Sequence, residues 1–170
     1  MEYKGKEYFF ADGVWVDVFG ELAPKKAQEA LYCEYLDSID MSNRLFDELV
    51  EFGDIYKQIK QYEKSLELYK RAYDMENDIA KIKGLFSRLS SCYRALNKPE
   101  DAISLYVLVK EKYGNKVITN PFKISVALAY CDVKDYEKAK ELADWAFAAS
   151  NGFSNAADVY QRIKRETEND

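Results

Sequence analysis

Apolar and small side chains recur along the chain in three sets that have the spacing of helix pairs. In each set, apolar residues three and four positions apart define one face of a first helix, and a small residue begins the buried face of a second. The small residue and a tyrosine of the first helix each recur at intervals of 37 residues. The small residues are Ser65, Ala102 and Ala139, and the tyrosines are Tyr56, Tyr93 and Tyr130. The period predicts three stacked helix pairs, because one pair cannot bury its apolar face alone.

A three- or four-helix bundle is the alternative interpretation of these amphipathic segments. A bundle would share the helical periodicity, but it would not repeat one interval at five or more positions. The constant interval therefore favours a repeat architecture over a bundle.

The residues at these positions resemble the tetratricopeptide repeat. The first unit carries Phe52-Gly53-x-x-Tyr56, then Tyr62-Glu63-Lys64-Ser65, Tyr69 and Ala72, and the third unit opens its second helix with Asp135-Tyr136-Glu137-Lys138-Ala139. The resemblance covers roughly residues 45 to 150 and three units. It implies an all-α fold, a right-handed tetratricopeptide-like superhelix of helix pairs.

Two features depart from the family pattern. The period is about three residues longer than the family's, and the closing proline is missing. We attribute both to a first helix that begins almost one turn early in units two and three. Asp78 and Asn120 are then the expected N-cap residues, with Pro121 at the first helical position.

Further elements are expected at both ends of the repeats. Asn151-Gly152 is a strong helix stop, and Ser154 is the expected cap of a final helix over residues 154–166 that covers the array. Pro24 opens a helix in residues 23–40, where Ala27 precedes Ser65 by nearly one period. We interpret this helix as half of a degenerate unit.

Asp12-Gly13 between two runs of aromatic and β-branched residues predicts a β-hairpin within residues 1–22. A two-residue turn places Phe10 opposite Trp15 and Phe9 opposite Val16. One interpretation is that the hairpin covers the apolar end of the first helix pair in place of a missing helix. The alternative is that Phe10 and Trp15 form a surface for docking or dimerisation. The whole chain is then one domain, with the three helix pairs in residues 41–153.

Composition restricts the partners of the chain. Its 170 residues carry a formal charge of −5, and Lys and Arg are not clustered, which argues against binding to nucleic acid or to an anionic membrane. No stretch approaches the roughly 20 apolar residues of a membrane span, and no signal peptide is recognised, so a cytoplasmic location is expected. Cys33, Cys92 and Cys131 are expected to be free thiols in helices.

The sequence gives little support for catalysis. Histidine is absent, which removes the commonest general base and zinc ligand. No glycine loop has the spacing needed to hold phosphate, and there is no Cys-x-x-Cys. Carboxylates alternate with Lys and Arg on helix faces, as is typical of solvated surfaces. We therefore expect neither an enzyme nor a metal or cofactor site.

The resemblance implies that the first helix of each unit lines a concave groove. At the groove positions the chain carries Val50, Asp54 and Lys57, then Ser87, Ser91 and Arg94, then Ile124, Leu128 and Cys131, preceded in each unit by Asp47, Gly84 or Pro121. One subclass of the family holds a C-terminal carboxylate with Lys and Asn where this chain has Val50 and Asp54. This chain therefore departs from that clamp.

The sequence thus favours a protein–protein interaction module or adaptor that binds a peptide segment of another protein in the groove. The size and acidity of the array also resemble those of bacterial secretion chaperones, although the hairpin is not expected in that class. A self-associating scaffold, homo-oligomeric through the hairpin, is a further alternative.

Overall fold

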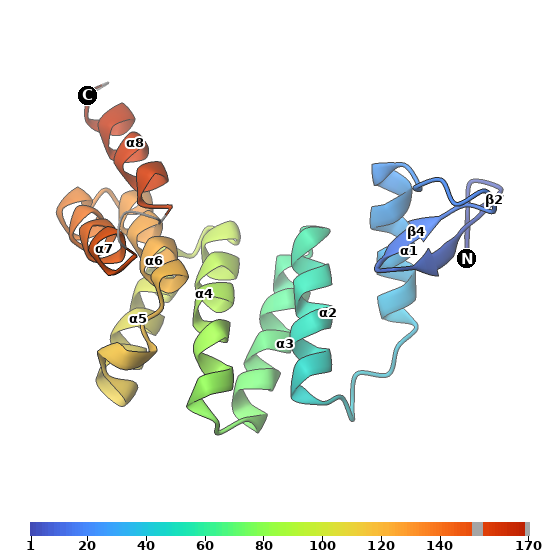
Figure 1. Cartoon of the computed structure of the whole chain (residues 1–170), viewed down its shortest axis with the longest axis horizontal. Coiled ribbons are helices and arrows are strands. Elements are labelled where there is room, and N and C mark those ends of the chain that lie inside the picture. The colour runs from blue at the N-terminus through green and yellow to red at the C-terminus, as the bar shows by residue number, and fades with distance from the viewer. Residues whose placement is uncertain (151–154, 169–170) are drawn as a thin grey trace.

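The computed structural model describes residues 1–150 and 155–168 (Figure 1). Within these ranges the chain forms two small hairpins followed by eight α-helices and one short 3-10 helix. The helices are α1 (Lys25–Asp37), α2 (Phe46–Gln58), α3 (Tyr62–Met75), α4 (Ile79–Ala95), α5 (Pro99–Tyr113), η1 (Asn115–Val117), α6 (Asn120–Asp132), α7 (Tyr136–Ala149) and α8 (Ala156–Thr167). None of these helices is long and apolar enough to cross a membrane.

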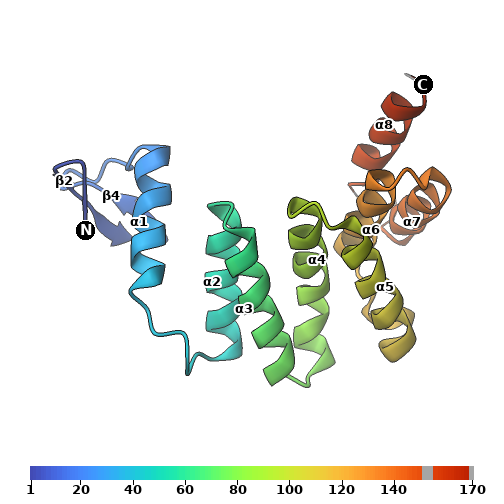
Figure 2. The ribbon, with the colours of Figure 1, turned by 180° about the vertical axis from the view of Figure 1, so that it is seen from behind.

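The helices from α2 to α7 form the three predicted pairs, α2 with α3, α4 with α5 and α6 with α7, stacked one after another (Figures 1 and 2). The small residues of the period, Ser65, Ala102 and Ala139, are fully buried where the two helices of a pair meet. The hydroxyl of Ser65 donates to the carbonyl of Gly53 at 2.8 Å, so this buried polar group is paired. The repeat interpretation is confirmed.

The turn inside each pair repeats with the same period. One residue of each turn adopts a positive φ, with values of 63°, 58° and 62° at Lys60, Asn97 and Lys134. The residue after it donates its backbone N–H to the carbonyl of the periodic tyrosine five residues earlier, at 2.8 to 2.9 Å. This arrangement is a left-handed helix ending that satisfies carbonyls in the last turn of the first helix.

The extra residues of the longer period lie in different places in the two later units. In the second unit α4 has 17 residues against 13 in α2, and the Asp78 carboxylate accepts from the Ala80 N–H at 2.8 Å, as predicted. In the third unit the early start is wrong, since α6 has only 13 residues. There the extra length forms the turn at Gly114 and η1, whose Val117 is buried.

The N-cap predicted for the third unit is also wrong. Thr119 occupies that position, and its hydroxyl accepts from the Phe122 N–H. Asn120 is the first helical residue and Pro121 the second. Thr119 and Asn120 are both good capping residues, and the pattern of neighbouring side chains did not decide between them.

The N-terminal segment contains the predicted hairpin and a second one that was not predicted. Strands β3 (Phe9–Ala11) and β4 (Val14–Val16) pair with Phe10 opposite Trp15 and Phe9 opposite Val16, and the turn has positive φ at Asp12 and Gly13. The hairpin and its register are confirmed. Strands β1 (Glu2–Tyr3) and β2 (Lys6–Glu7) form the second hairpin.

The β3–β4 hairpin packs on α1, on the side of that helix that faces away from α2 (Figures 1 and 2). Trp15 is only 3% exposed and lies against the rings of Tyr32 and Tyr35, which corrects the expectation that it belongs to the hairpin surface. The side-chain amide of Gln28 bonds to both backbone groups of Trp15, as a neighbouring strand would. It accepts from the Trp15 N–H at 3.0 Å and donates to the Trp15 carbonyl at 2.7 Å. The hairpin therefore covers α1, and the expectation that it covers the apolar end of the first helix pair is wrong.

The α1 ribbon stands apart from α2 (Figure 1), and polar side-chain contacts join α1 and the connection after it to the first pair. The Asp37 carboxylate accepts from Lys64 at 2.6 Å and from the Tyr56 hydroxyl at 3.4 Å. Arg71 of α3 donates to the carbonyl of Met41 in the connection between α1 and α2. Buried apolar side chains of the hairpin, α1 and the first pair also belong to one hydrophobic cluster.

Helix α8 closes the other end against α6 and α7. It begins at Ala156 and ends at Thr167, close to the predicted bounds. The predicted helix stop at Asn151-Gly152 and the cap at Ser154 lie outside the described residues. Val159 and Ala156 are buried beneath the helix, as its amphipathic pattern requires.

Candidate functional site

A cavity of about 500 Å³ lies between α4 and α6, and we call it the α4–α6 cavity. It brings together six of the nine side chains predicted to line the groove. These six are Lys57 from α2, Ser87, Ser91 and Arg94 from α4, and Ile124 and Leu128 from α6. They meet because equivalent positions of stacked first helices face the same side.

Sequence reasoning missed several other lining residues of the α4–α6 cavity. Asn120 and Ser125 extend its wall along α6, and Asn155 reaches it from the start of α8. The Ser125 hydroxyl also bonds to that of Ser90 at 2.9 Å, so this wall is tied to α4. Asn155 had no signal in the repeat pattern, because α8 lies beyond the last unit.

Val50 and Asp54 do not join this cavity. The Asp54 carboxylate forms a two-pronged ion pair with Arg88, at 2.8 Å to Nε and 2.9 Å to Nη2, and accepts from the Tyr69 hydroxyl at 2.6 Å. Val50 is partly buried against the core. The first unit thus contributes chiefly Lys57 to the site.

Cys131 does not join the cavity either. It is 1% exposed and borders a separate hollow with Tyr136 and Arg162. Burial raises the pKa of its thiol above the ordinary value, which keeps the sulfur protonated and less reactive. Cys92 is also a buried free thiol, whereas Cys33 is half-buried.

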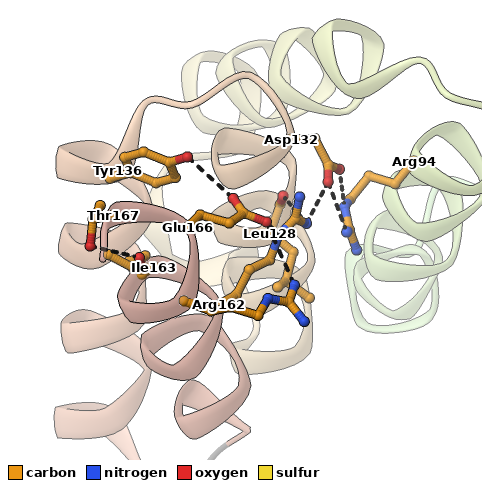
Figure 3. A network of polar contacts seen from close by, with 9 residues as sticks. Arg94, Leu128, Asp132, Tyr136, Arg162, Ile163, Glu166 and Thr167 are labelled. Carbon is orange, nitrogen blue, oxygen red and sulfur yellow. Dashed lines mark hydrogen bonds and ion pairs between the residues drawn. The ribbon is translucent and has the colours of Figure 1, made fainter. Parts of the chain in front are cut away.

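Arg94 is held at the edge of the cavity by a network of ion pairs (Figure 3). Asp132 accepts from Arg94 Nε at 2.7 Å and from Arg162 Nη1 at 2.5 Å, and so joins α4, α6 and α8. Arg162 also donates through Nε to Glu166 at 2.7 Å, which holds the pKa of that carboxyl below its ordinary value. The network fixes the last helix and the orientation of the Arg94 guanidinium together.

The Asp54–Arg88 pair yields a prediction about acid stability. Burial alone would raise the pKa of Asp54, but the hydrogen bonds from Arg88 and Tyr69 bring it below its ordinary value. A lowered folded-state pKa stabilises the protein above the unfolded pKa, and that stability is lost as pH falls through the folded value. We expect Asp54→Asn to lower the free energy of unfolding by about 1 kcal/mol at pH 7 and by less at pH 3.

Urea unfolding at the two pH values measures this difference. Glu67→Gln, which removes an exposed carboxylate of α3, is the control and should change stability little at either pH. An Asp54→Asn deficit that is as large at pH 3 as at pH 7 would show that the carboxylate charge is not the cause.

Three stacked antiparallel helix pairs, each with the same left-handed turn between its helices, and a covering helix after the last pair define a helical-repeat fold of the tetratricopeptide type. The sequence profile described as the tetratricopeptide repeat matches residues 49–79. The match in sequence and the fold together confirm the predicted resemblance to this family. No curated protein matches the chain in sequence.

Solved structures share the fold. The Sgt2 tetratricopeptide domain from Aspergillus fumigatus is 24% identical, with a TM-score of 0.57, over 72% of this chain and 79% of that one. BtubC from P. vanneervenii is 16% identical, with a TM-score of 0.51, over 82% and 69% of the two chains. MamA of MSR-1 is 13% identical, with a TM-score of 0.50, over 85% and 90%. These likenesses concern the fold.

Proposed function

We propose that the chain is a protein–protein interaction module that binds a peptide segment of a partner in the α4–α6 cavity. The observation that carries the proposal is the meeting of Lys57, Ser91, Arg94 and Leu128 in one cavity across three helices. An extended peptide needs such a row of polar groups with an apolar anchor point. An adaptor is the form of this function that we favour, and a small dedicated chaperone is the alternative.

The test uses peptides as the probe. A random 12-residue library displayed on phage is selected on the intact chain, and the recovered sequences are synthesised for affinity measurements by fluorescence anisotropy. Leu128→Asp is expected to weaken binding by about tenfold or more, because it puts a charge on the apolar wall of the cavity. Leu108→Asp is the control, since Leu108 is an exposed leucine of α5 that does not line the cavity.

Circular dichroism establishes that both variants keep their helices. Peptides that bind the wild type and Leu128→Asp equally well would place the binding surface elsewhere and overturn the proposal.

Self-association through the hairpin is a second candidate, favoured by an apolar strip on the face opposite Trp15. Phe9 is 52% exposed and Leu22 is 67% exposed, and Leu22 forms a bridge to Val16, the partner of Phe9. We expect light scattering to show a dimer that Phe9→Glu dissociates. A wild-type chain that stays monomeric at high concentration would rule this candidate out.

A further inference from the structure

We infer that the α4–α6 cavity selects a peptide segment in which an acidic side chain stands next to an aliphatic one. The inference rests on the proposed function and adds the chemistry of the ligand to it. Three features of the cavity support it: the charged lining groups are cations, Lys57 forms no ion pair among the described residues, and apolar residues of α6 lie beside the cations.

The charged groups that line the cavity are cations. Lys57 and Arg94 occupy the same position in the first and second units, so they extend from neighbouring helices on the same side of the array. Neither Asp nor Glu is among the described lining residues. A carboxylate entering the cavity therefore meets two cations and no acidic side chain among the described lining residues.

Lys57 forms no hydrogen bond or ion pair among the residues that the structure describes. Its charge acts on the Asp54 carboxylate one turn earlier in α2 and contributes to the lowered pKa of that group. Arg88 and Tyr69 already engage both oxygens of Asp54. The Lys57 charge is thus left available to a ligand.

Arg94 forms an ion pair but keeps N–H donors that a ligand could use. Asp132, which is not among the described lining residues, accepts from its Nε and Nη2 atoms at 2.7 and 3.4 Å. A guanidinium has five N–H donors, so others remain for a ligand carboxylate. Since Asp132 and Arg162 hold the group in place, a ligand meets an oriented donor at a smaller entropic cost than from a free side chain.

The apolar wall stands beside these cations. Pro121, Ile124 and Leu128 follow one another at three- and four-residue steps, so they form one stripe on α6. Leu128 is half-buried and is one of the residues that line the cavity. An aliphatic ligand side chain can cover it while a neighbouring acidic side chain reaches Lys57 and Arg94. Both contacts are available to one peptide because the stripe and the cations line the same hollow.

The overall charge of −5 points toward a basic partner, whereas the cavity points toward an acidic one. The local charge decides, because exposed charges more than about 10 Å away are largely screened at 0.1 M salt. Lys57 and Arg94 do not occupy the positions of the family's carboxylate clamp. In the first unit, those positions hold Val50 and Asp54. The site is therefore a separate arrangement built by Lys57, Arg94 and the α6 stripe.

To test this inference, peptides are selected on the wild-type chain, and those that also bind Leu128→Asp are removed. The remaining peptides are then sequenced. We expect Asp or Glu within two residues of Leu, Ile or Val in most recovered sequences. In the synthesised peptides, changing the acidic residue to its amide should weaken binding about 10- to 100-fold, the effect of losing a hydrogen bond to a charged group. Amidation of the peptide C-terminus should have little effect, which separates a side-chain carboxylate from a chain-terminal one.

Variants of the protein supply the matched test. Lys57→Glu should weaken binding at least as much as the peptide change and remove most of the salt dependence, while Lys83→Glu, an exposed lysine on α4 outside the cavity, should leave affinity within about twofold. Cavity-dependent peptides without acidic residues, or with an essential terminal carboxylate, would overturn this inference but leave the proposed function standing. Recovery of no cavity-dependent peptide would overturn both.

Discussion

Replacing Trp15 with alanine is expected to unfold the N-terminal segment locally while the helix pairs remain folded. The indole is almost fully buried and contacts the rings of Phe10, Tyr32 and Tyr35 at centroid distances of 5.2, 6.4 and 5.9 Å. Removing a buried aromatic side chain costs about 3 to 5 kcal/mol. We expect the lower end of this range, because the buried Trp15 indole N–H has no acceptor among the described residues, and the cost of that unpaired donor disappears with the side chain.

The loss should be largest in the hairpins and α1, because the rings of Phe10, Tyr32 and Tyr35 that contact Trp15 belong to these elements. In a repeat array, each unit is stabilised by its neighbours, so damage at one end need not spread through the later units. Hydrogen exchange should therefore show faster exchange of the α1 amides and unchanged protection in α4 and α6.

Phe9→Ala is the matched control for Trp15→Ala. Phe9 lies on the same hairpin but on its outer face, half-exposed, and its loss should change α1 protection by no more than about 0.5 kcal/mol. Equal acceleration in both variants would mean that the hairpin does not stabilise α1 through its inner face.

The features predicted from sequence were those fixed by neighbouring residues or by the period. Asp12-Gly13 determined the turn and therefore the register of β3 with β4, since only a few residues tolerate two successive positive φ values. The period placed Ser65 and its equivalents between paired helices, and it brought Lys57 and Arg94 to one side. Each of these follows from local spacing alone.

The features that escaped prediction depend on side chains far apart in sequence. Arg88 engages Asp54 across 34 residues, and Asp132 joins Arg94 to Arg162 across three helices. The rotation between stacked units decides which cation meets which carboxylate. The spacing of residues within one helix carries no information about that rotation. The charge pattern of the cavity therefore became visible only in the folded chain.

Gly53→Ala is expected to lower the free energy of unfolding by about 1 to 3 kcal/mol, although alanine normally stabilises a helix interior. A Cβ atom at Gly53 would lie 2.5 Å from Cε1 and 2.8 Å from Cδ1 of Tyr69. The ring cannot withdraw easily, because it is fully buried and its hydroxyl is bonded to Asp54 at 2.6 Å. The glycine in α2 is thus required by the close approach of α3.

Gly84→Ala in α4 is the matched comparison and should have the opposite sign. The nearest atom to a Cβ there is Arg88 Nη1 at 3.5 Å, an ordinary contact, so alanine should stabilise α4 by about 0.5 to 1 kcal/mol. Urea unfolding of both variants measures the contrast, and a stabilising Gly53→Ala would show that Tyr69 can move. The added methyl group presses on the Tyr69 ring and so strains the hydrogen bond from its hydroxyl to Asp54. The destabilised Gly53→Ala variant should therefore also lose part of the acid dependence attributed to that carboxylate.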